Sequence, residues 1–330
     1  MDKPMEKLIQ KPIDNVYIYL ADPEIRTEQI ETLQRNMPTG WAFISIPGKA
    51  VAILTENVDV SRQTLEQMPD VRLILRLDTG RARVARTRIP AVDLSNTGLI
   101  GVAEHVVTLI LALSRRLLWV ARQSAAAAWV PDKDQSILTD QRKYTFNWIG
   151  LENSGAIYNK KVGIVGLGHI GRAVALRLRP FGVRLLYTDL QRLSPAVEKR
   201  FGVHWRSRDD LLKESDFVTL HLRFVEGPHG NEKMIGEREF NLMKPGAFFI
   251  NTSRGRLVDE DALVEALRSK KIGGAGLDVF RYEPLPKDHP LLSLAGDQVI
   301  LTSHTAGSYN PEAWQTTAEE IIERIQEVLS

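Results

Sequence analysis

From Lys161 to Gly171 the chain reads Lys-Val-Gly-Ile-Val-Gly-Leu-Gly-His-Ile-Gly, and this stretch decides the fold. Its short apolar run predicts a buried parallel strand, and the Gly-x-Gly-x-x-Gly pattern predicts a tight turn into a helix. Gly166 allows the turn, Gly168 lets the backbone approach a pyrophosphate, and the last glycine lets the helix pack closely on the strand. Free N–H groups at the helix N-terminus then hold the phosphates. The stretch therefore indicates a nucleotide-binding βαβ unit rather than a coincidental glycine turn.

A carboxylate follows the next predicted strand, which is the apolar run at 183–187. Asp189 stands 18 residues after Gly171 (189 − 171 = 18). At this position a carboxylate accepts hydrogen bonds from the adenosine ribose hydroxyls of NAD and repels the 2′-phosphate of NADP. Arg192, three residues on, could partly offset that repulsion. We therefore expect NAD as the cofactor, with NADP as the less favoured alternative.

Bulk composition excludes several classes of protein. The chain has 330 residues, which favours two domains over one. Its 43% hydrophobic and 25% charged residues are ordinary for a globular protein, and a net charge of +2 predicts no general affinity for nucleic acid or membranes. The absence of cysteine excludes disulfides, thiolate catalysis and cysteine zinc sites, and we expect no metal site. The first residues lack the apolar core of a signal peptide, so a cytoplasmic location is expected.

Strand and helix patterns alternate along the chain, which predicts α/β domains with parallel sheets. The expected strands outside the nucleotide-binding unit are 16–20, 41–46, 50–54, 71–77, 217–222, 247–251, 274–279 and 299–302. The expected helices are 24–35, 61–67, a long and mostly buried helix at 102–122, and 312–329.

The nucleotide-binding unit lies in the middle of the chain, with α/β patterns on both sides. We therefore expect two doubly wound parallel-sheet domains, one inserted into the other. Residues 104–303 would form a Rossmann dinucleotide-binding domain, and residues 1–103 with 304–330 a flavodoxin-like substrate-binding domain. Residues 123–160 lack clear periodicity, and a connection of that length indicates a functional segment or an interface arm.

Three polar segments follow the nucleotide motif, each at or near the end of a predicted strand. They are residues 251–255 (Asn-Thr-Ser-Arg-Gly), 277–286, and 301–307 (Leu-Thr-Ser-His-Thr-Ala-Gly). The carboxyl ends of strands line the ligand crevice of an open α/β sheet, so an arginine, a carboxylate and an imidazole would meet there. A histidine suits the proton transfer that accompanies hydride transfer at an oxygen-bearing carbon. An arginine can bind a substrate carboxylate through paired hydrogen bonds and polarise the adjacent carbonyl.

Four motifs make a family resemblance specific. The glycine turn, Asn-x-x-Arg-Gly-x-x-Val-Asp, Leu-Asp-Val-Phe-x-x-Glu-Pro and His-x-Ala-Gly occur in the order and spacing of the D-isomer-specific 2-hydroxyacid dehydrogenase family. Ala103-Glu104-His105, ahead of an apolar helix, also fits. The chain resembles this family from Val71 to the C-terminus and agrees with it only in pattern before that point.

The resemblance implies three catalytic roles. Arg254 would bind the substrate carboxylate and carbonyl, His304 would be the general acid/base, and Glu283 would orient it. Each has a plainer alternative: a surface arginine, a structural histidine and a solvated loop carboxylate. Structural or surface positions are expected for the other histidines near the motifs, which are His221, His229 and His105 with Glu104.

The resemblance also implies how the cofactor and a second subunit are held. Thr252 and Asp278 would contact the nicotinamide end, and the backbone of His169 and Ile170 would contact the pyrophosphate. For Asp278 the alternative is a buried capping role. Residues 123–160 would be the arm that builds a homodimer.

The chain departs from the family where the substrate loop begins. Asp78-Thr79-Gly80 replaces a glycine-rich loop, and Arg76, Thr79 and Gly80 are the candidate substrate residues. Fixed guanidinium groups there would suit a substrate with a second anionic group, but we favour the alternative that these arginines lie on a solvated face. The arginines concerned are Arg76, Arg81, Arg83, Arg86 and Arg88. The family's proline is replaced at two further positions, Arg223 and Ser303.

Together these features predict an NAD-dependent oxidoreductase that transfers hydride between nicotinamide and a small 2-hydroxy acid or its 2-keto counterpart. Its partners would be an anionic small molecule and a second copy of the chain, without nucleic acid or membrane. Two alternatives stay open: a dehydrogenase of a small anion such as formate or phosphite, and a nucleotide-sensing, corepressor-like binding protein. The set of Arg254, Glu283 and His304 favours the hydroxy acid, because fold alone does not fix function.

Overall fold

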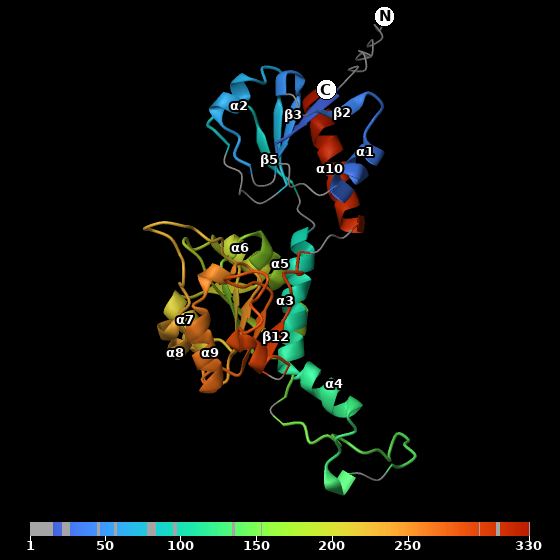
Figure 1. Ribbon diagram of the computed structural model, residues 1–330, viewed down its shortest axis with the longest axis vertical. Helices are drawn as coiled ribbons and strands as arrows, with labels where there is room; N and C mark the ends of the chain where they lie inside the picture. The colour runs from blue at the N-terminus through green and yellow to red at the C-terminus, as the bar shows by residue number, and fades with distance from the viewer. Residues whose placement is uncertain are drawn as a thin grey trace, which may run out of the picture. The chain divides into compact units, whose positions relative to one another are not determined.

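The chain folds into two compact units, residues 1–98 with 309–330 and residues 99–308 (Figure 1). The predicted division into domains at 103 and 304 stays a prediction. The structure, a computed structural model, describes residues 16–21, 27–44, 47–55, 58–77, 84–94, 98–133, 136–152, 154–296, 298–307 and 311–329.

The first unit is built on a parallel sheet with the strand order β2-β1-β3-β4-β5. This is the 2-1-3-4-5 order of flavodoxin-like folds, as predicted. The strands are β1 (Val16–Leu20), β2 (Trp41–Ile44), β3 (Ala52–Thr55), β4 (Leu73–Arg76) and β5 (Ala91–Asp93). The α-helices are α1 (Thr27–Asn36), α2 (Arg62–Glu66) and α10 (Pro311–Leu329).

Helices cover both faces of this first sheet. Successive residues of a strand point to opposite faces, so Leu54 packs with Leu33 of α1 and Ile321 of α10, whereas Ile53 packs with Met68 next to α2. The C-terminal helix, although it follows the second unit in sequence, therefore completes the core of the first.

The second unit carries a seven-stranded sheet with the order β12-β11-β10-β9-β6-β7-β8, in which every pair is parallel. When the strands are counted from β6, the strands from β8 to β11 have the 3-2-1-4-5-6 order of the Rossmann fold, as the sequence predicted. The strand order reverses between β6 and β9. The strands are β6 (Lys161–Val165), β7 (Arg184–Thr188), β8 (Val203–Trp205), β9 (Phe217–Leu220), β10 (Phe248–Asn251), β11 (Gly274–Leu277) and β12 (Val299–Leu301). The α-helices are α3 (Gly98–Ser114), α4 (Leu117–Ala125), α5 (His169–Leu178), α6 (Pro195–Phe201), α7 (Arg208–Glu214), α8 (Glu237–Leu242) and α9 (Glu260–Arg268).

Two apolar layers enclose the second sheet. On one face Leu109 of α3 and Val174 of α5 pack with Ile164 of β6. On the other face Phe240 of α8 and Leu263 of α9 join the core that includes the opposite-facing residues of the same strands. The strand ends at the β6–β9 reversal are thereby fixed, and ligands of such sheets bind beside that point.

One predicted helix is wrong. The sequence predicted a single helix over 102–122, but the structure has two, because α3 ends at Ser114 and α4 begins at Leu117. Arg116 between them has φ +47°, in the left-handed region, and this breaks the run of helical hydrogen bonds. The short strands β5 and β8 were not predicted at all.

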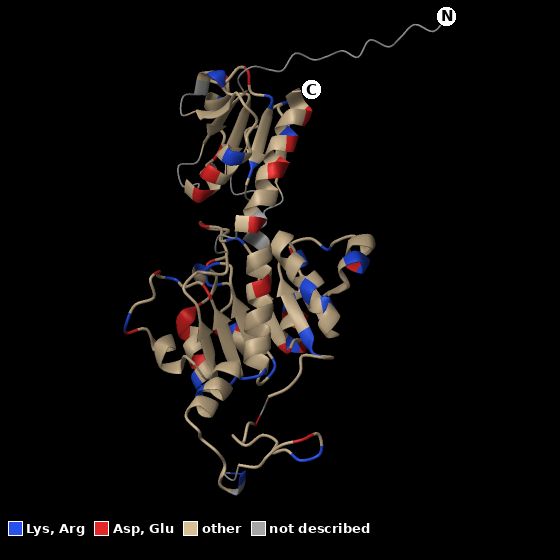
Figure 2. Cartoon of the chain, turned by 90° about the vertical axis from the view of Figure 1, so that its right-hand side faces the viewer, with Lys and Arg blue, Asp and Glu red and all other residues tan. Residues whose placement is uncertain are grey.

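The segment at 123–160 is largely irregular beyond the end of α4 and leads away from the sheet of the second unit (Figures 1 and 2). Trp129 and Trp148 meet edge to face within it, with ring centroids 6.2 Å apart. Basic and acidic residues are interspersed over both units (Figure 2). In the part of the chain that the structure describes, no helix is both long and apolar enough to cross a membrane.

Candidate active site

The glycine loop joins β6 to α5 and has the shape of a phosphate cradle. Gly166 has φ +93°, and a Cβ there would lie 2.6 Å from the carbonyl oxygen of His221, which follows β9. A Cβ on Gly171 would lie 2.2 Å from the oxygen of Gly166, so no side chain fits at either position. At Gly168 a Cβ would meet nothing within 4 Å. The loop is therefore tight against the protein and open at the position where a pyrophosphate approaches, so these residues fit a dinucleotide.

Asp189 stands at the end of β7, beside that loop. Its Oδ2 accepts a hydrogen bond of 2.8 Å from the N–H of Leu167, and its Oδ1 accepts one of 2.7 Å from the N–H of Leu190. Asp189 thus holds the glycine loop while its carboxylate stays partly exposed. It occupies the place where a ribose-binding carboxylate is expected.

Arg192 is held by a neighbouring carboxylate. Its Nε and one terminal nitrogen donate to the two oxygens of Glu198 at 2.9 and 3.2 Å, and the hydroxyl of Tyr187 donates to Glu198 at 2.9 Å. The hydrogen bond from Arg192 holds the pKa of Glu198 below its ordinary value. An arginine engaged in this way is less able to offset repulsion between Asp189 and a 2′-phosphate.

The turn after β10 is stabilised by hydrogen bonds of Asn251, the last residue of that strand. The Asn251 side chain accepts from the N–H and hydroxyl of Ser253, at 3.0 and 2.9 Å, and donates to the carbonyl of Arg254 at 3.0 Å. Arg254 is half-buried and donates from Nη1 to the carbonyl of Ser253. Among the described residues this is the hydrogen bond that its side chain makes, so its remaining N–H donors are available to a ligand.

Gly255 brings the segment that carries Arg254 into contact with the loop that carries Glu283. A Cβ at Gly255 would lie 1.9 Å from the carbonyl carbon of Phe280, so the two backbones touch. The N–H of Phe280 donates to Oε1 of Glu283 at 2.9 Å, and Oε2 of Glu283 lies 2.7 Å from Nδ1 of His304. The structure therefore brings Glu283 and His304 into direct contact and places Arg254 on a segment packed against the same loop.

Asp278 is fully buried and organises the turn that carries His304. Its Oδ1 accepts from the N–H of Thr305 and its Oδ2 from the N–H of Ala306, both at 2.9 Å, and the hydroxyl of Thr302 donates to Oδ1 at 2.6 Å. These contacts match the capping role that the sequence left open. A contact with the nicotinamide stays a prediction.

Thr252 supplies a second sign that the site fits a ligand. It is only 7% exposed, and within the described residues its buried hydroxyl oxygen has no hydrogen-bond partner. A buried polar atom without a partner costs free energy, so a hydrogen-bonding group of a ligand would be favoured there. This agrees with the predicted contact between Thr252 and the nicotinamide end. His169 and Ile170 begin α5, where their backbone can face the same cradle.

The candidate substrate residues lie in the first unit. Thr79 and Gly80, like Arg81 and Arg83, fall outside the described residues. The Nε of Arg76 lies 2.6 Å from Oδ1 of Asp93 on the neighbouring strand β5. Arg86 and Arg88 are exposed, as expected for a solvated face. Whether this segment forms a second anion site stays a prediction.

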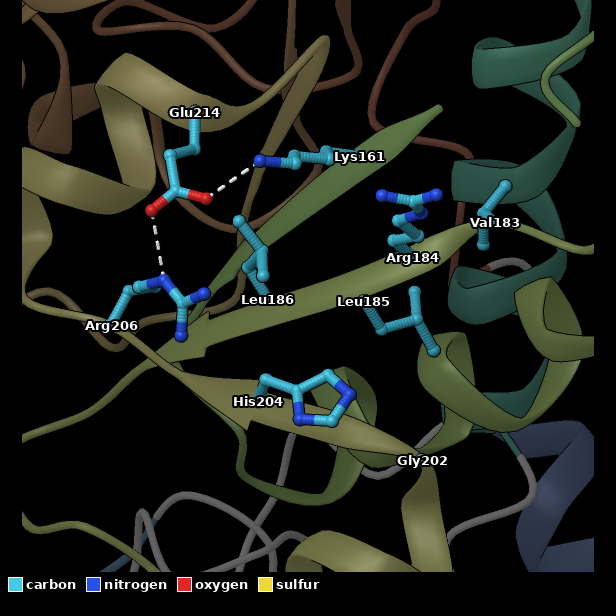
Figure 3. A pocket seen from close by; sticks show the side chains of 9 residues that line it. All are labelled: Lys161, Val183, Arg184, Leu185, Leu186, Gly202, His204, Arg206 and Glu214. Carbon is cyan, nitrogen blue, oxygen red and sulfur yellow. Dashed lines mark hydrogen bonds and ion pairs between the residues drawn. The ribbon is translucent and has the colours of Figure 1, made fainter. Parts of the chain in front are cut away.

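Two hollows of about 310 Å³ each lie elsewhere on the second unit. One is lined by Lys161, Arg184, His204 and Arg206, and there Glu214 pairs with Lys161 at 2.7 Å and with Arg206 at 2.9 Å (Figure 3). The other lies around Lys244 and the start of β10. Neither includes Arg254, Glu283 or His304, so neither belongs to the candidate active site.

A dinucleotide cradle on a Rossmann sheet, with a histidine–carboxylate pair on the same unit, is the arrangement expected of a nicotinamide-dependent dehydrogenase. A sequence model described as "D-isomer specific 2-hydroxyacid dehydrogenase, NAD binding domain" matches residues 107–306, which is more than half of the chain. The chain belongs to this family and is an oxidoreductase acting on 2-hydroxy acids, as the sequence predicted.

Relatives within and around the family are similar over most of their length. The chain is 37% identical to glyoxylate/hydroxypyruvate reductase B of Klebsiella pneumoniae over 298 residues, which cover 87% of this chain and 84% of the relative. Two solved structures share the fold. D-lactate dehydrogenase of Aquifex aeolicus with NAD and lactic acid has a TM-score of 0.63 and 24% identity, covering 95% of both chains. An acyclic imino acid reductase with NADPH and D-Arg has a TM-score of 0.65 and 22% identity, covering 95% of this chain and 97% of that one.

Proposed function

We propose that the protein reduces a small 2-keto acid to the D-2-hydroxy acid, and catalyses the reverse, with His304, Glu283 and Arg254 as its catalytic residues. The observation that carries the proposal is the 2.7 Å contact between Nδ1 of His304 and Oε2 of Glu283, beside the arginine segment. When bound, the reduced nicotinamide supplies the hydride that adds to the carbonyl carbon.

His304 moves the proton that must accompany the hydride. Because Nδ1 faces Glu283, the other ring nitrogen, Nε2, is the one that faces a substrate and donates the proton to the carbonyl oxygen. Glu283 accepts the Nδ1–H, fixes the ring orientation and compensates the positive charge of the protonated imidazole. In the oxidation direction the same nitrogen takes the proton from the hydroxyl.

Arg254 binds the substrate. Its free N–H donors can form paired bonds to the carboxylate and polarise the neighbouring carbonyl, so that negative charge developing on the oxygen is stabilised. Loss of this residue should raise KM as well as lower kcat, since the interaction is made in both the bound substrate and the transition state.

Glyoxylate and hydroxypyruvate are the substrates that we propose first. The Klebsiella pneumoniae relative is named for both, and the pairing of Arg76 with Asp93 gives no support to a doubly anionic substrate. Oxidation of NADH by purified protein should be measured with glyoxylate, hydroxypyruvate, pyruvate, oxaloacetate and phosphohydroxypyruvate. Higher kcat/KM for the dianions, lost in Arg76→Ala, would instead establish the arginine segment as a second anion site.

NAD(H) is the cofactor that we propose, since within the described residues no ion pair joins Asp189 to a basic side chain, and Arg192 is paired with Glu198. A homodimer through 123–160 is proposed because this segment exposes large apolar side chains, including Leu138, Phe146 and Tyr144, at 93%, 77% and 64%. Sedimentation of the wild type and of Phe146→Asp tests the dimer.

We also propose that the protein is located in the cytoplasm.

Two other functions stay as outcomes of the same assay. Oxidation of formate to carbon dioxide moves no proton on oxygen, so the His304–Glu283 pair would have no proton to transfer. A cofactor-sensing protein without catalysis would bind NADH and turn over none of the acids. Turnover of a 2-keto acid that is lost in His304→Ala, and kept in His229→Ala at an exposed position, supports the proposed reaction against both.

A further inference from the structure

A hydrogen-bonded chain leads from helix α3 to the turn that carries His304. Nε2 of His105 lies 3.0 Å from the hydroxyl oxygen of Thr302, and that hydroxyl lies 2.6 Å from Oδ1 of Asp278. His105 and Thr302 are 197 positions apart in sequence. The proposed mechanism gives none of these three side chains a part in the reaction.

Counting the available protons shows which of the three side chains donates each hydrogen bond. A carboxylate oxygen can only accept, so the single hydroxyl proton of Thr302 is donated to Asp278. The hydroxyl has a second possible acceptor, the carbonyl of Leu277, but at 3.5 Å it is far weaker. The hydroxyl oxygen must therefore accept from His105, whose Nε2 carries a proton. His105 therefore donates a hydrogen bond to Thr302, and Thr302 donates one to Asp278.

Asp278 in turn holds three successive N–H groups. Its backbone carbonyl accepts from the N–H of His304 at 2.8 Å, and its two carboxylate oxygens accept from those of Thr305 and Ala306. His304 itself has φ +54°, a left-handed conformation that a residue with a Cβ rarely adopts and that surrounding bonds must enforce. Asp278 thus holds the turn that carries the proton donor at three N–H groups, and its buried carboxylate holds two of them.

No proline ring restrains the backbone just before His304. The residue before His304 is Ser303, which unlike proline leaves φ free to rotate. The Asp278 carboxylate can rotate about its own side-chain bonds unless its acceptors are saturated. The hydroxyl of Thr302, itself oriented by His105, supplies the shorter of two side-chain hydrogen bonds to Oδ1, at 2.6 Å against 3.5 Å from the hydroxyl of Thr305.

We infer that His105 is a positioning residue for the reaction: through Thr302 and Asp278 it holds His304 in the orientation that contacts Glu283. This inference rests on the proposed function, because it assigns His304 the proton transfer. It goes beyond the structural or surface position that the sequence predicted for His105.

The test compares His105→Ala with His105→Gln, whose amide nitrogen can donate from nearly the same place as Nε2. For His105→Ala we expect kcat to fall roughly tenfold, the loss typical of one well-placed hydrogen bond, with KM for the keto acid and Kd for NADH little changed. His105→Gln should recover most of kcat. Thr108→Val is the matched control, since Thr108 lies on the same helix and, within the described residues, its hydroxyl bonds back to the carbonyl of Glu104 at 2.9 Å and to no other group.

A second measurement does not need turnover. In protein labelled at histidine, the ring resonances assigned to His304, by their loss in His304→Ala, should shift in His105→Ala and not in Thr108→Val. Unchanged kcat and unchanged His304 resonances in His105→Ala would overturn the inference. It would also be overturned by a loss of thermal stability and cofactor binding that His105→Gln fails to restore.

The two proposals can fail separately. A wild type that turns over no 2-keto acid refutes the proposed function, while the resonances of His304 still decide whether His105 positions it. A wild-type-like kcat in His105→Ala alongside an inactive His304→Ala refutes the positioning role alone.

Discussion

Replacing Glu283 by glutamine removes one charge from the catalytic pair and almost nothing else. The Oε1 that accepts from the N–H of Phe280 keeps its partner if it is the amide oxygen. The amide NH2 then faces Nδ1 of His304, which becomes a hydrogen-bond acceptor. In that tautomer Nε2 carries the proton of a neutral ring, and such a ring is a poor proton donor to a carbonyl.

The magnitude follows from the distance and the exposure of the pair. The two nitrogen and oxygen atoms lie 2.7 Å apart, but both charges are delocalised and their centres are farther apart, so we take about 4 Å, at which opposite charges interact by about 1 kcal/mol in water and about 4 kcal/mol near a protein surface. The side chains of His304 and Glu283 are 49% and 35% exposed, so a value near the middle, about 2 kcal/mol, is appropriate. In a rate constant this corresponds to roughly 30-fold.

We therefore expect Glu283→Gln to lower kcat for keto-acid reduction by roughly 30-fold, with Kd for NADH unchanged. Steady-state kinetics and NADH fluorescence titration measure the two quantities. Glu226→Gln is the control, because Glu226 is an exposed carboxylate paired with Arg256 at 3.3 Å on the surface. A Glu283→Gln enzyme with wild-type kcat would refute the role of the pair.

Three further predictions follow from single contacts. Asp189→Ser should raise the ratio of kcat/KM for NADPH to that for NADH by about tenfold, or ~1.4 kcal/mol, since it removes the repulsion of a 2′-phosphate; an unchanged ratio would contradict the cofactor assignment. Gly255→Ala should lower thermal stability by about 3 kcal/mol because its Cβ would meet the backbone of Phe280, whereas Gly155→Ala, in open space, should be neutral; equal melting temperatures would contradict this. Burial lowers the pKa of His221 to about 3. Below about pH 6.5, the ordinary pKa of histidine, the unfolded state therefore binds more protons than the folded state. The folded state loses stability as the pH falls from about 6.5 towards 3. In urea unfolding, His221→Gln should show a smaller loss of stability over that range than the wild type, and an equal loss would contradict a neutral, buried ring.

Short-range patterns predicted the parts of this protein that depend on neighbouring residues. The Gly166–Gly171 turn and the carboxylate at Asp189 were predictable because a strand, a tight turn and a helix each leave a local signal. The Rossmann and flavodoxin-like orders followed from the alternation of such signals and from the central position of the glycine turn.

Features set by single conformations or distant contacts were not predictable. Arg116 breaks the long helix through a left-handed φ, yet apolar residues continue at helical spacing on both sides of it. The strands β5 and β8 have three residues each, too few for alternation to show. The contact of His105 with Thr302 joins positions 197 apart, and no local pattern encodes it. The pairing of Arg76 with Asp93 likewise depends on which strands are neighbours.

The most direct test of the central claim is a single-turnover experiment with glyoxylate or hydroxypyruvate and stoichiometric NADH. Wild-type protein should oxidise the NADH and yield glycolate from glyoxylate, which is achiral, or D-glycerate from hydroxypyruvate. His304→Ala should bind NADH with unchanged Kd but oxidise it roughly two to four orders of magnitude more slowly, the usual contribution of a general acid. A His304→Ala protein that oxidises NADH at the wild-type rate would contradict the account.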